Sequence, residues 1–485
     1  MIAKQQALNP ALVPLATFFV VIAAALGFLT LQGKEVFGIL GLLAVLAATV
    51  IALRPDLGIL ILMASLFVTY KKFLPIEGKF TPNNLLGLFF TVLLFVKVYR
   101  EKDLWFFKEG TLRIFTLLLM FIVLSSTLAE QRLGSPIVEL DVTKQSLQSL
   151  VTRFVFLIFF VNFIRSLRDV NLVLCTLIGL ILVTAFSGAQ ASVEGMTPGS
   201  YRAAAKLGIH AAGNANRLAF LCVAGIAIVW YYRRTLRGGV LWLLLSVAIP
   251  GLALTALLTG SRSGLLNLGI LFVLIAMEGR FSIKRQIQTG LAVVVAAYLA
   301  GYFLTSTHVE RLENLSPNAS IGIKGTGSTE KRLRTIQDGL GMVVENPIFG
   351  VGIGNFMWVR LQRVGTSGPP HNSYLWALTG GGIPVLLLYL MLYGISLKNL
   401  LQVEGKARDP RLVAIARGVR TALLTFLVFS FFADFWLNVF MYLLIGLSVV
   451  LRRIQENEPR VVSGREFAPA IRAPAGRTRT QVLPA

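Results

Sequence analysis

The sequence predicts an all-α polytopic membrane protein with about 12 to 14 transmembrane helices, since a helix needs about 20 apolar residues to cross the hydrocarbon core of a bilayer. Hydrophobic residues make up 55% of the 485 residues, charged residues only 14%, and the mean hydropathy is +0.73. Soluble domains carry roughly 25% charged residues. The apolar residues also gather in long segments separated by basic loops, which is the pattern of repeated membrane crossings.

Apolar segments of suitable length recur from the N-terminus almost to the C-terminus. The segment before the first one, Met1 to Pro10, carries only Lys4 as a charge, and no small-residue cleavage site follows. We therefore expect a retained first span and not a removed signal peptide. The predicted spans are residues 12–31, 36–53, 57–74, 83–99, 111–128, 150–164, 170–187, 218–232, 240–259, 265–277, 287–304, 373–397, 412–432 and 435–451.

The basic residues predict the orientation. Lysine and arginine total 46 against 23 acidic residues, a net charge of +23. Basic loops resist translocation and stay in the cytoplasm. The basic loops near residues 100–108, 165–168, 233–237, 280–285 and 398–420 alternate with the spans, so all of them can be cytoplasmic together; only Lys71 and Lys72 fall on the other side. The charge is thus explained by topology, and no nucleic-acid partner is expected.

The same alternation divides the chain. We expect N-terminal transmembrane helices over 1–204, a functional core over 205–395 with a large outer loop at 305–372, C-terminal transmembrane helices over 396–452, and a basic, disordered cytoplasmic tail over 453–485. Within the outer loop, Ser328 or Thr329 can cap a helix, and apolar residues recur at helical spacing until Asn346-Pro347 stops it. This predicts an amphipathic helix on or near the outer membrane surface.

A first candidate site is residues 259–264, where Arg262 lies at the outer end of two spans beside Ser261. Arginine binds phosphate through paired N–H donors, so an anion site is one interpretation. The other is an interfacial arginine that reaches the lipid headgroups. The basic residue Arg332, at the start of the loop helix, is a second candidate cation, although its segment alone favours a solvated basic turn.

Two further segments face the same side. Alternating glycines at 350–354, including Gly352 and Gly354, can form a backbone nest for an anion or a tightly packed turn. His371 stands where the chain re-enters the membrane after Pro369-Pro370, with Asn372 able to cap the next helix. A histidine can accept a proton from a hydroxyl nucleophile. His210, in another outer loop, is its competitor, and His308 has no such context.

Metal chemistry has little support in the sequence. There is no histidine pair at ligand spacing and no cysteine cluster, since Cys175 and Cys222 fall in separate apolar segments. Glu139 and Asp141 form the one notable acidic pair in an outer loop. We therefore expect no metal site and no cofactor.

Taken in order, residues 259–264, Arg332-Leu333 with its helix, 346–356 and 370–375 resemble the characteristic region of the O-antigen ligase and polymerase superfamily. The resemblance covers roughly residues 205–395. The segment 213–219, with Asn214 and Arg217, is similar to the family's Gly-Asn-Pro-Asn segment, but Ala215 replaces the proline. Ile336 stands where an aromatic residue is common. Neither departure changes a charged position.

The resemblance implies a fold like that of C-type glycosyltransferases, in the bacterial inner membrane, with the site on the periplasmic face. It implies a donor glycan carried on undecaprenyl diphosphate, and an acceptor that is lipid A-core or another lipid-linked glycan. Arg262 and Arg332 would bind the diphosphate, and His371 would activate the acceptor hydroxyl or orient the phosphate. Ser261, Asn214, Arg217, Gly352, Gly354 and Asn372 would give weaker contacts.

Several functions stay open at this point. Within the superfamily, a ligase in lipopolysaccharide synthesis is the first hypothesis, and a polymerase of O-antigen or exopolysaccharide repeats is its alternative. A protein-glycosylating relative is a third. From other classes, a flippase for lipid-linked oligosaccharides shares the span count, and a non-catalytic scaffold predicts that replacing His371 has no effect.

Overall fold

The structure is a computed structural model that describes residues 49, 51–67, 82–101, 108–133, 140–193, 214–277 and 323–458. These residues form helices joined by turns, without a strand among them. Seven of the described helices are long and apolar enough to cross a membrane, and α3 and α11 are shorter apolar helices. The predicted class, an all-α polytopic membrane protein, is confirmed. The total of about 12 to 14 spans stays a prediction, because the segments 12–31 and 287–304 lie outside the described residues.

The helix bounds follow the predicted spans closely but extend past them at many ends. The described helices are α3 (Pro55–Phe67), α4 (Pro82–Glu101), α6 (Gly110–Leu133), α7 (Leu140–Phe163), α8 (Leu167–Val193), α9 (Ala215–Tyr232), the 3-10 turn η4 (Arg233–Thr235), α10 (Val240–Leu258), α11 (Arg262–Met277), α14 (Ile323–Glu345), α15 (Phe356–Val364), α16 (Ser373–Lys406), α17 (Pro410–Phe429) and α18 (Val439–Glu456).

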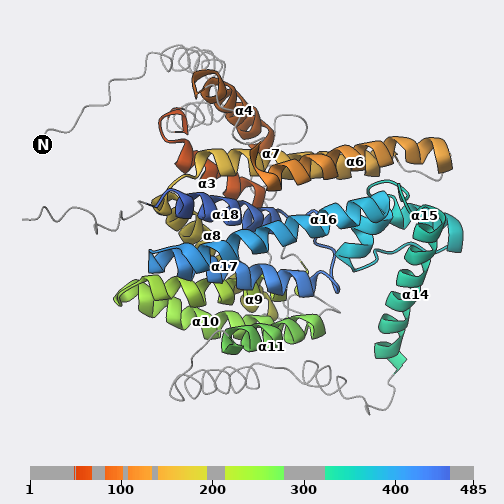
Figure 1. Ribbon diagram of the computed structural model, residues 1–485. Helices are drawn as coiled ribbons and strands as arrows, with labels where there is room; N and C mark the ends of the chain where they lie inside the picture. The colour runs from red at the N-terminus through yellow and green to blue at the C-terminus, as the bar shows by residue number, and fades with distance from the viewer. Residues whose placement is uncertain are drawn as a thin grey trace, which may run out of the picture.

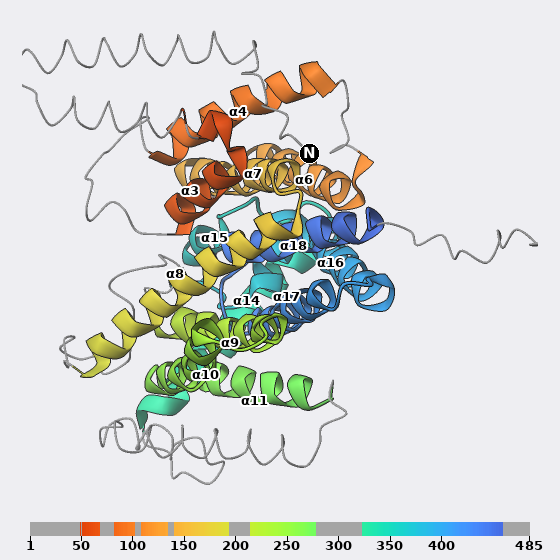
Figure 2. The same ribbon diagram turned by 90° about the vertical axis from the view of Figure 1, so that its left-hand side faces the viewer.

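The long helices lie roughly side by side in three groups (Figures 1 and 2). Helices α3, α4, α6 and α7 lie on one side, α9, α10 and α11 on the other, and α16, α17 and α18 between them. Helix α9 is apolar around its whole circumference and is buried against α10 and α17, as expected of a helix enclosed by others. Its Phe220 ring meets those of Phe426 and Phe435 at 5.1 and 4.9 Å, which ties α9 to the segment between α17 and α18.

Polar contacts define two ends of this bundle. At one, which we call the basic end, Lys97 Nζ donates to the carbonyl of Asn162 at 2.7 Å, and Arg452 pairs with Glu109 at 2.5 Å. The connections between α7 and α8, between α9 and α10, and between α16 and α17, with their arginines and lysines, follow from the up-and-down order of the helices and lie at this end.

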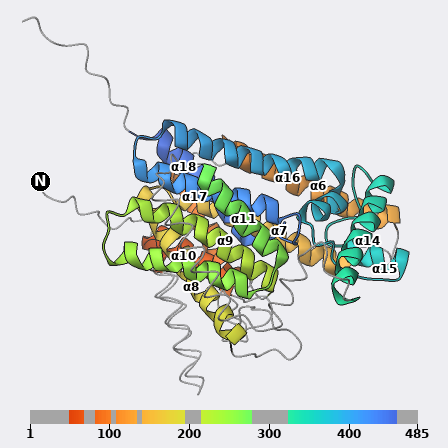
Figure 3. The ribbon, with the colours of Figure 1, turned by 90° about the horizontal axis from the view of Figure 1, so that it is seen from below.

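At the opposite end, which we call the loop end, α14 and α15 cover the bundle. Figure 1 shows α14 running across the direction of α6 and α16, and Figure 3 shows both α14 and α15 at the same end from another side. Asn355, before α15, donates to Thr143 of α7 at 2.9 Å, and Arg132 of α6 donates to Asn346 after α14 at 3.2 Å. These contacts attach the large loop to the bundle.

The outer loops differ from their prediction in two ways. Most of 129–149 is helical, because α6 continues to Leu133 and α7 begins at Leu140. Helix α14 begins at Ile323, so Ser328 and Thr329 lie inside it and do not cap it, although it ends before Asn346-Pro347 as predicted. Its apolar stripe of Leu333, Leu340 and Val344 is exposed, while Met342, Val343 and Thr335 are buried against the protein.

Candidate functional site

The start of α16 is fixed to the segment between α17 and α18. Asn372 caps the helix, its side chain accepting a hydrogen bond from Leu375 N at 3.0 Å. Ser373 is fully buried and binds the neighbouring segment three times: its N donates to Ser430 O, its Oγ donates to Ala433 O, and its Oγ accepts from Phe435 N, at 2.7 to 2.8 Å. Asn372 is thus a structural cap, and the residue before it is held in place.

That residue is His371, and it faces Asp434. His371 Nδ1 lies 3.2 Å from Asp434 Oδ2, and Trp376 Nε1 donates to Asp434 Oδ1 at 2.8 Å. His371 has a φ of 49°, which is a left-handed conformation uncommon for residues other than glycine. Its side chain is 41% exposed. In the tautomer that this carboxylate favours, the proton is on Nδ1 and Nε2 keeps its lone pair, an arrangement typical of a general base.

Asp434 is a candidate site residue that sequence reasoning missed. It stands alone between two apolar spans, in the segment Phe432-Ala433-Asp434-Phe435. A carboxylate at the edge of a membrane span is costly and usually has a partner or a function. That signal could have singled it out, but no spacing in the sequence links it to His371.

Arg262 and Arg332 are cations with no partner in the described part of the chain. Arg262 is exposed as the first residue of α11, and Arg332 is partly buried on α14. No hydrogen bond or ion pair within the described ranges engages either guanidinium, and none joins the two arginines or joins them to His371. All three residues nevertheless belong to the loop end of the bundle.

The weaker candidates divide into two groups. Ser261 is fully buried and holds the turn before α11: its Oγ donates to Asn216 Oδ1 at 2.9 Å and accepts from Gly264 N at 3.1 Å. Asn214 caps α9 by accepting from Asn216 N. Arg217, by contrast, reaches the histidine's neighbourhood, with NH2 donating to the Asp434 carbonyl at 3.5 Å and its guanidinium 5.9 Å from the centre of the Phe435 ring.

The glycine run 350–354 forms a packed turn that fits into a break in α16. Gly352 and Gly354 have φ near 85°, and a Cβ on Gly354 would lie 2.5 Å from Ser146 Oγ. Val351 N donates to Thr379 O at 2.7 Å, just before the non-helical Gly381 and Gly382. Tight packing therefore accounts for these glycines. A broken helix is also a common device for building sites inside membrane proteins.

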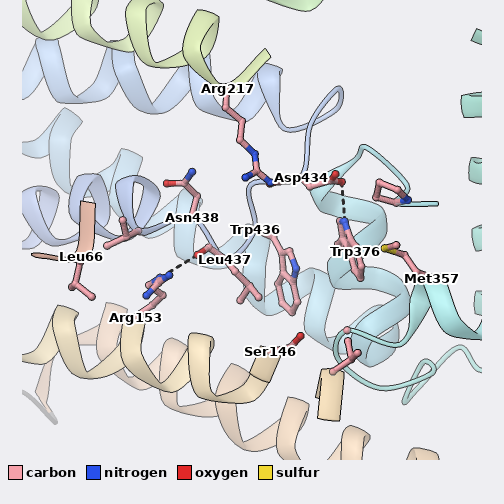
Figure 4. A pocket seen from close by; sticks show the side chains of 14 residues that line it. Leu66, Ser146, Arg153, Arg217, Met357, Trp376, Asp434, Trp436, Leu437 and Asn438 are labelled. Atoms are coloured by element: carbon pink, nitrogen blue, oxygen red, sulfur yellow. Dashed lines mark hydrogen bonds between the residues drawn. The ribbon is translucent and has the colours of Figure 1, made fainter. Parts of the chain in front are cut away.

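A cavity of about 670 Å³ opens beside Asp434 (Figure 4). Its volume lies in the usual range for small-molecule sites. It extends between α7, α15, α16 and α18, with two tryptophans, two arginines and Asp434 in its wall. The lining residues are Leu66, Val142, Ser146, Arg153, Arg217, Gly354, Met357, Pro369, Trp376, Asp434, Trp436, Leu437, Asn438 and Val439.

Metal ligands are not grouped in the described ranges, where no three His, Cys, Asp or Glu residues come together. Asp141 lies in the first turn of α7 and is exposed. Its predicted neighbour Glu139 falls outside the described residues, as do His210, His308, Lys71, Lys72 and the tail from 459.

The helical spans and the covering loop with its own helices define a polytopic membrane protein, with a histidine–carboxylate pair and a cavity at one end. Residues 247–390 match a family model described as O-antigen ligase. This part of the chain is thus similar to the O-antigen ligase family, which supports the resemblance to the ligase and polymerase superfamily. The match includes Arg262, Arg332 and His371, while Arg217 and Asp434 lie outside it. No curated protein matched the chain.

Proposed function

We propose that this protein transfers a glycan from undecaprenyl diphosphate to a sugar hydroxyl of an acceptor, as an O-antigen ligase does in lipopolysaccharide synthesis. The observation that carries the proposal is the His371–Asp434 pair, at the same bundle end as two arginines that no described residue neutralises. A hydroxyl nucleophile needs a base, and a diphosphate leaving group needs charge neutralisation.

The proposed step is a single displacement at the anomeric carbon of the donor. The acceptor oxygen forms a bond to that carbon while the bond from the carbon to the diphosphate oxygen breaks. The hydroxyl proton passes to His371 Nε2, and Asp434 stabilises the imidazolium through Nδ1–H. The electron pair leaves with the diphosphate, whose growing charge Arg262 and Arg332 neutralise. No metal is needed for this division of labour.

The orientation of the site belongs to the same proposal. Since the basic connections gather at one end of the bundle, the positive-inside rule assigns that end to the cytoplasm. The loop end then faces the periplasm, where the lipid-linked donor would present its glycan. The exposed stripe of Leu333, Leu340 and Val344 on α14 could then rest on the periplasmic surface of the membrane.

The test is reconstitution of the full chain in proteoliposomes with a synthetic undecaprenyl-diphosphate glycan. Acceptors are offered separately: lipid A-core, a second lipid-linked repeat, and a peptide. We expect glycosylated lipid A-core, with the rate unchanged by EDTA. Product on the lipid-linked repeat would instead make the protein a polymerase, the second candidate in the same superfamily, and product on the peptide would identify a protein-glycosylating relative.

The rivals from other classes predict different results in the same vesicles. A flippase would move the glycan across the bilayer and form no new glycosidic bond. A scaffold would do neither, and His371→Ala would be silent in cells. Either result would refute the enzyme proposal.

A further inference from the structure

Arg153 of α7 is a cation that neither the sequence patterns nor the family match singles out. It lies seven residues after Ser146, which is roughly 10 Å further along the helix, and both residues line the cavity beside Asp434. Gly354, Met357 and Pro369 line the cavity at the loop end. Arg153 therefore lies at the inner end of the cavity, within a membrane-spanning helix.

The guanidinium of Arg153 is only partly satisfied by protein. Its Nε donates to the Leu437 carbonyl at 3.1 Å, and no other hydrogen bond or ion pair reaches it from the described part of the chain. Arginine has five N–H donors, so four are available to the cavity. A charged residue within a span is costly and normally has a partner. Because no described carboxylate supplies it, a ligand with an anionic group is the natural partner.

The rest of the wall suits a saccharide. Trp376 and Trp436 present flat aromatic surfaces, and Asn438 and Asp434 offer polar groups beside them. Figure 4 shows Arg217 reaching in from α9 and Arg153 from α7, on opposite sides of the segment that carries Leu437. A mostly apolar wall with a few placed polar groups is typical of small-molecule sites.

The cavity is also distinct from the arginines assigned to the donor. Neither Arg262 nor Arg332 lines it. Asp434 links it to His371, since one carboxylate oxygen accepts from Trp376 in the cavity wall and the other faces His371. The cavity therefore lies next to the proposed base and has its own set of lining residues, a position from which a hydroxyl group could reach the base.

We infer that this cavity binds the acceptor glycan and that Arg153 binds an anionic group, a phosphate or a carboxylate, on that glycan. The inference rests on the proposed function, since it assigns the acceptor to a cavity that the two donor-binding arginines do not line.

The test measures binding without turnover, so that it does not depend on transfer being observed. The purified full chain is titrated calorimetrically with a phosphorylated core oligosaccharide, with the same oligosaccharide after phosphatase treatment, and with a hexuronate-containing oligosaccharide. A charge-assisted hydrogen bond contributes about 1.5–3 kcal/mol, so we expect the phosphorylated ligand to bind at least about 10-fold more tightly than its neutral form. If the hexuronate ligand binds more tightly than the neutral oligosaccharide, the site accepts a carboxylate. If only the phosphorylated ligand does so, the site is specific for phosphate.

Variants link this preference to one residue. Arg153→Gln should remove the preference for anionic ligands, and Arg153→Lys should keep part of it. Lys144→Gln removes one charge from an exposed position on the same helix, outside the cavity, and should change nothing. Equal affinity of the wild type for charged and neutral oligosaccharides would overturn the inference even if the variants fail to fold. The inference would also be overturned if an Arg153 variant lost affinity for undecaprenyl diphosphate and kept its affinity for the oligosaccharides.

Discussion

His371 Nδ1 lies 3.2 Å from Asp434 Oδ2, and the second oxygen of that carboxylate accepts a hydrogen bond from Trp376. A carboxylate at this distance favours the tautomer that carries its proton on Nδ1, which leaves Nε2 as the proton acceptor. The left-handed φ of His371 is maintained by the anchored residues that follow it, Asn372 and Ser373. Strain held in this way by surrounding structure is characteristic of functional sites.

The first prediction concerns this pair. His371→Ala should lower kcat by about 10²- to 10⁴-fold, the usual contribution of a general base. Asp434→Asn should lower kcat as well, and the double variant should be no worse than His371→Ala alone, because residues that act as a unit are not additive. Initial rates of glycan transfer in proteoliposomes measure this. Independent, multiplying losses would contradict the pairing.

A control variant at Trp376 tests whether the rate depends on the contact of Asp434 with His371 or on its hydrogen bond to the tryptophan. Trp376→Phe removes the hydrogen bond to Asp434 Oδ1 and leaves Oδ2 free to bind His371. We expect a smaller loss of kcat than in Asp434→Asn. A loss as large as that of Asp434→Asn would mean that the tryptophan, and not the histidine, is the partner of the carboxylate that matters for the rate.

The second prediction concerns Arg262, one of the two arginines that have no partner among the described residues. Arg262→Gln should lower kcat by at least about 10²-fold, as for the loss of one donor to a developing anion, and Arg262→Lys should recover little, since lysine cannot bind phosphate through two parallel hydrogen bonds. Because no described residue binds the Arg262 guanidinium, Tm in detergent should not change.

Arg132→Gln is the matched control for Arg262. Arg132 also lies at the loop end, but its NH1 and NH2 donate to Asn346 Oδ1 and Gly350 O at 3.2 and 3.1 Å. Its loss should lower Tm and affect the rate less than Arg262→Gln does. If Arg262→Gln lowers Tm while Arg132→Gln abolishes transfer, the two roles have been assigned the wrong way round.

The spans could be predicted from sequence because few backbone structures are stable inside a lipid bilayer. Every backbone group in the hydrocarbon region must be satisfied internally, so an apolar segment of the right length forms a helix. Ends were less predictable: α7 begins at Leu140, ten residues before the predicted span, since its first turns are polar and need no lipid. The sequence of α14 did not show which of its apolar residues pack against the protein and which stay exposed. Both the protein and the membrane surface can cover apolar residues, so the spacing of those residues is the same in either case.

The site was predictable only where a residue's own surroundings carried the signal. His371 follows two prolines and precedes a cap, and Arg262 stands between two serines at a span end, so both could be singled out. Asp434, Trp376 and Arg153 reach the site through tertiary contacts that no spacing encodes. In the sequence, Arg153 is one charge near the start of the predicted span 150–164.

The third prediction concerns the position of Arg332. Helix α15 holds α14 through two ion pairs, Arg360 Nε with Asp338 Oδ2 at 2.8 Å and the more exposed Arg363 with Glu345. Arg360→Gln should destabilise this attachment by about 1.5–3 kcal/mol, the range for hydrogen bonds to charged groups, and raise KM for the lipid-linked donor. Arg363→Gln should cost at most about 1 kcal/mol, as for exposed pairs. Hydrogen exchange of α14 and donor titrations measure both effects; equal effects of the two variants would contradict the prediction.

The fourth prediction concerns the break in α16. Gly382 has a φ of 74°, and a Cβ there would lie 2.3 Å from the Ile348 carbonyl oxygen, which follows α14 directly. Ile383 N donates to Pro347 O at 2.8 Å across the same contact. Gly382→Ala should lower the free energy of unfolding by roughly 1–3 kcal/mol through the backbone conformation alone. The clash adds to this loss and should push the 346–355 turn away from α16.

Gly394→Ala, in the regular part of the same helix, is the control. It has open space around it and should be neutral or slightly stabilising, because alanine favours helix. Thermal unfolding in detergent, with accessibility of a cysteine introduced at the exposed Ile348, measures both changes. Equal Tm for Gly382→Ala and wild type would show that the turn does not depend on the break.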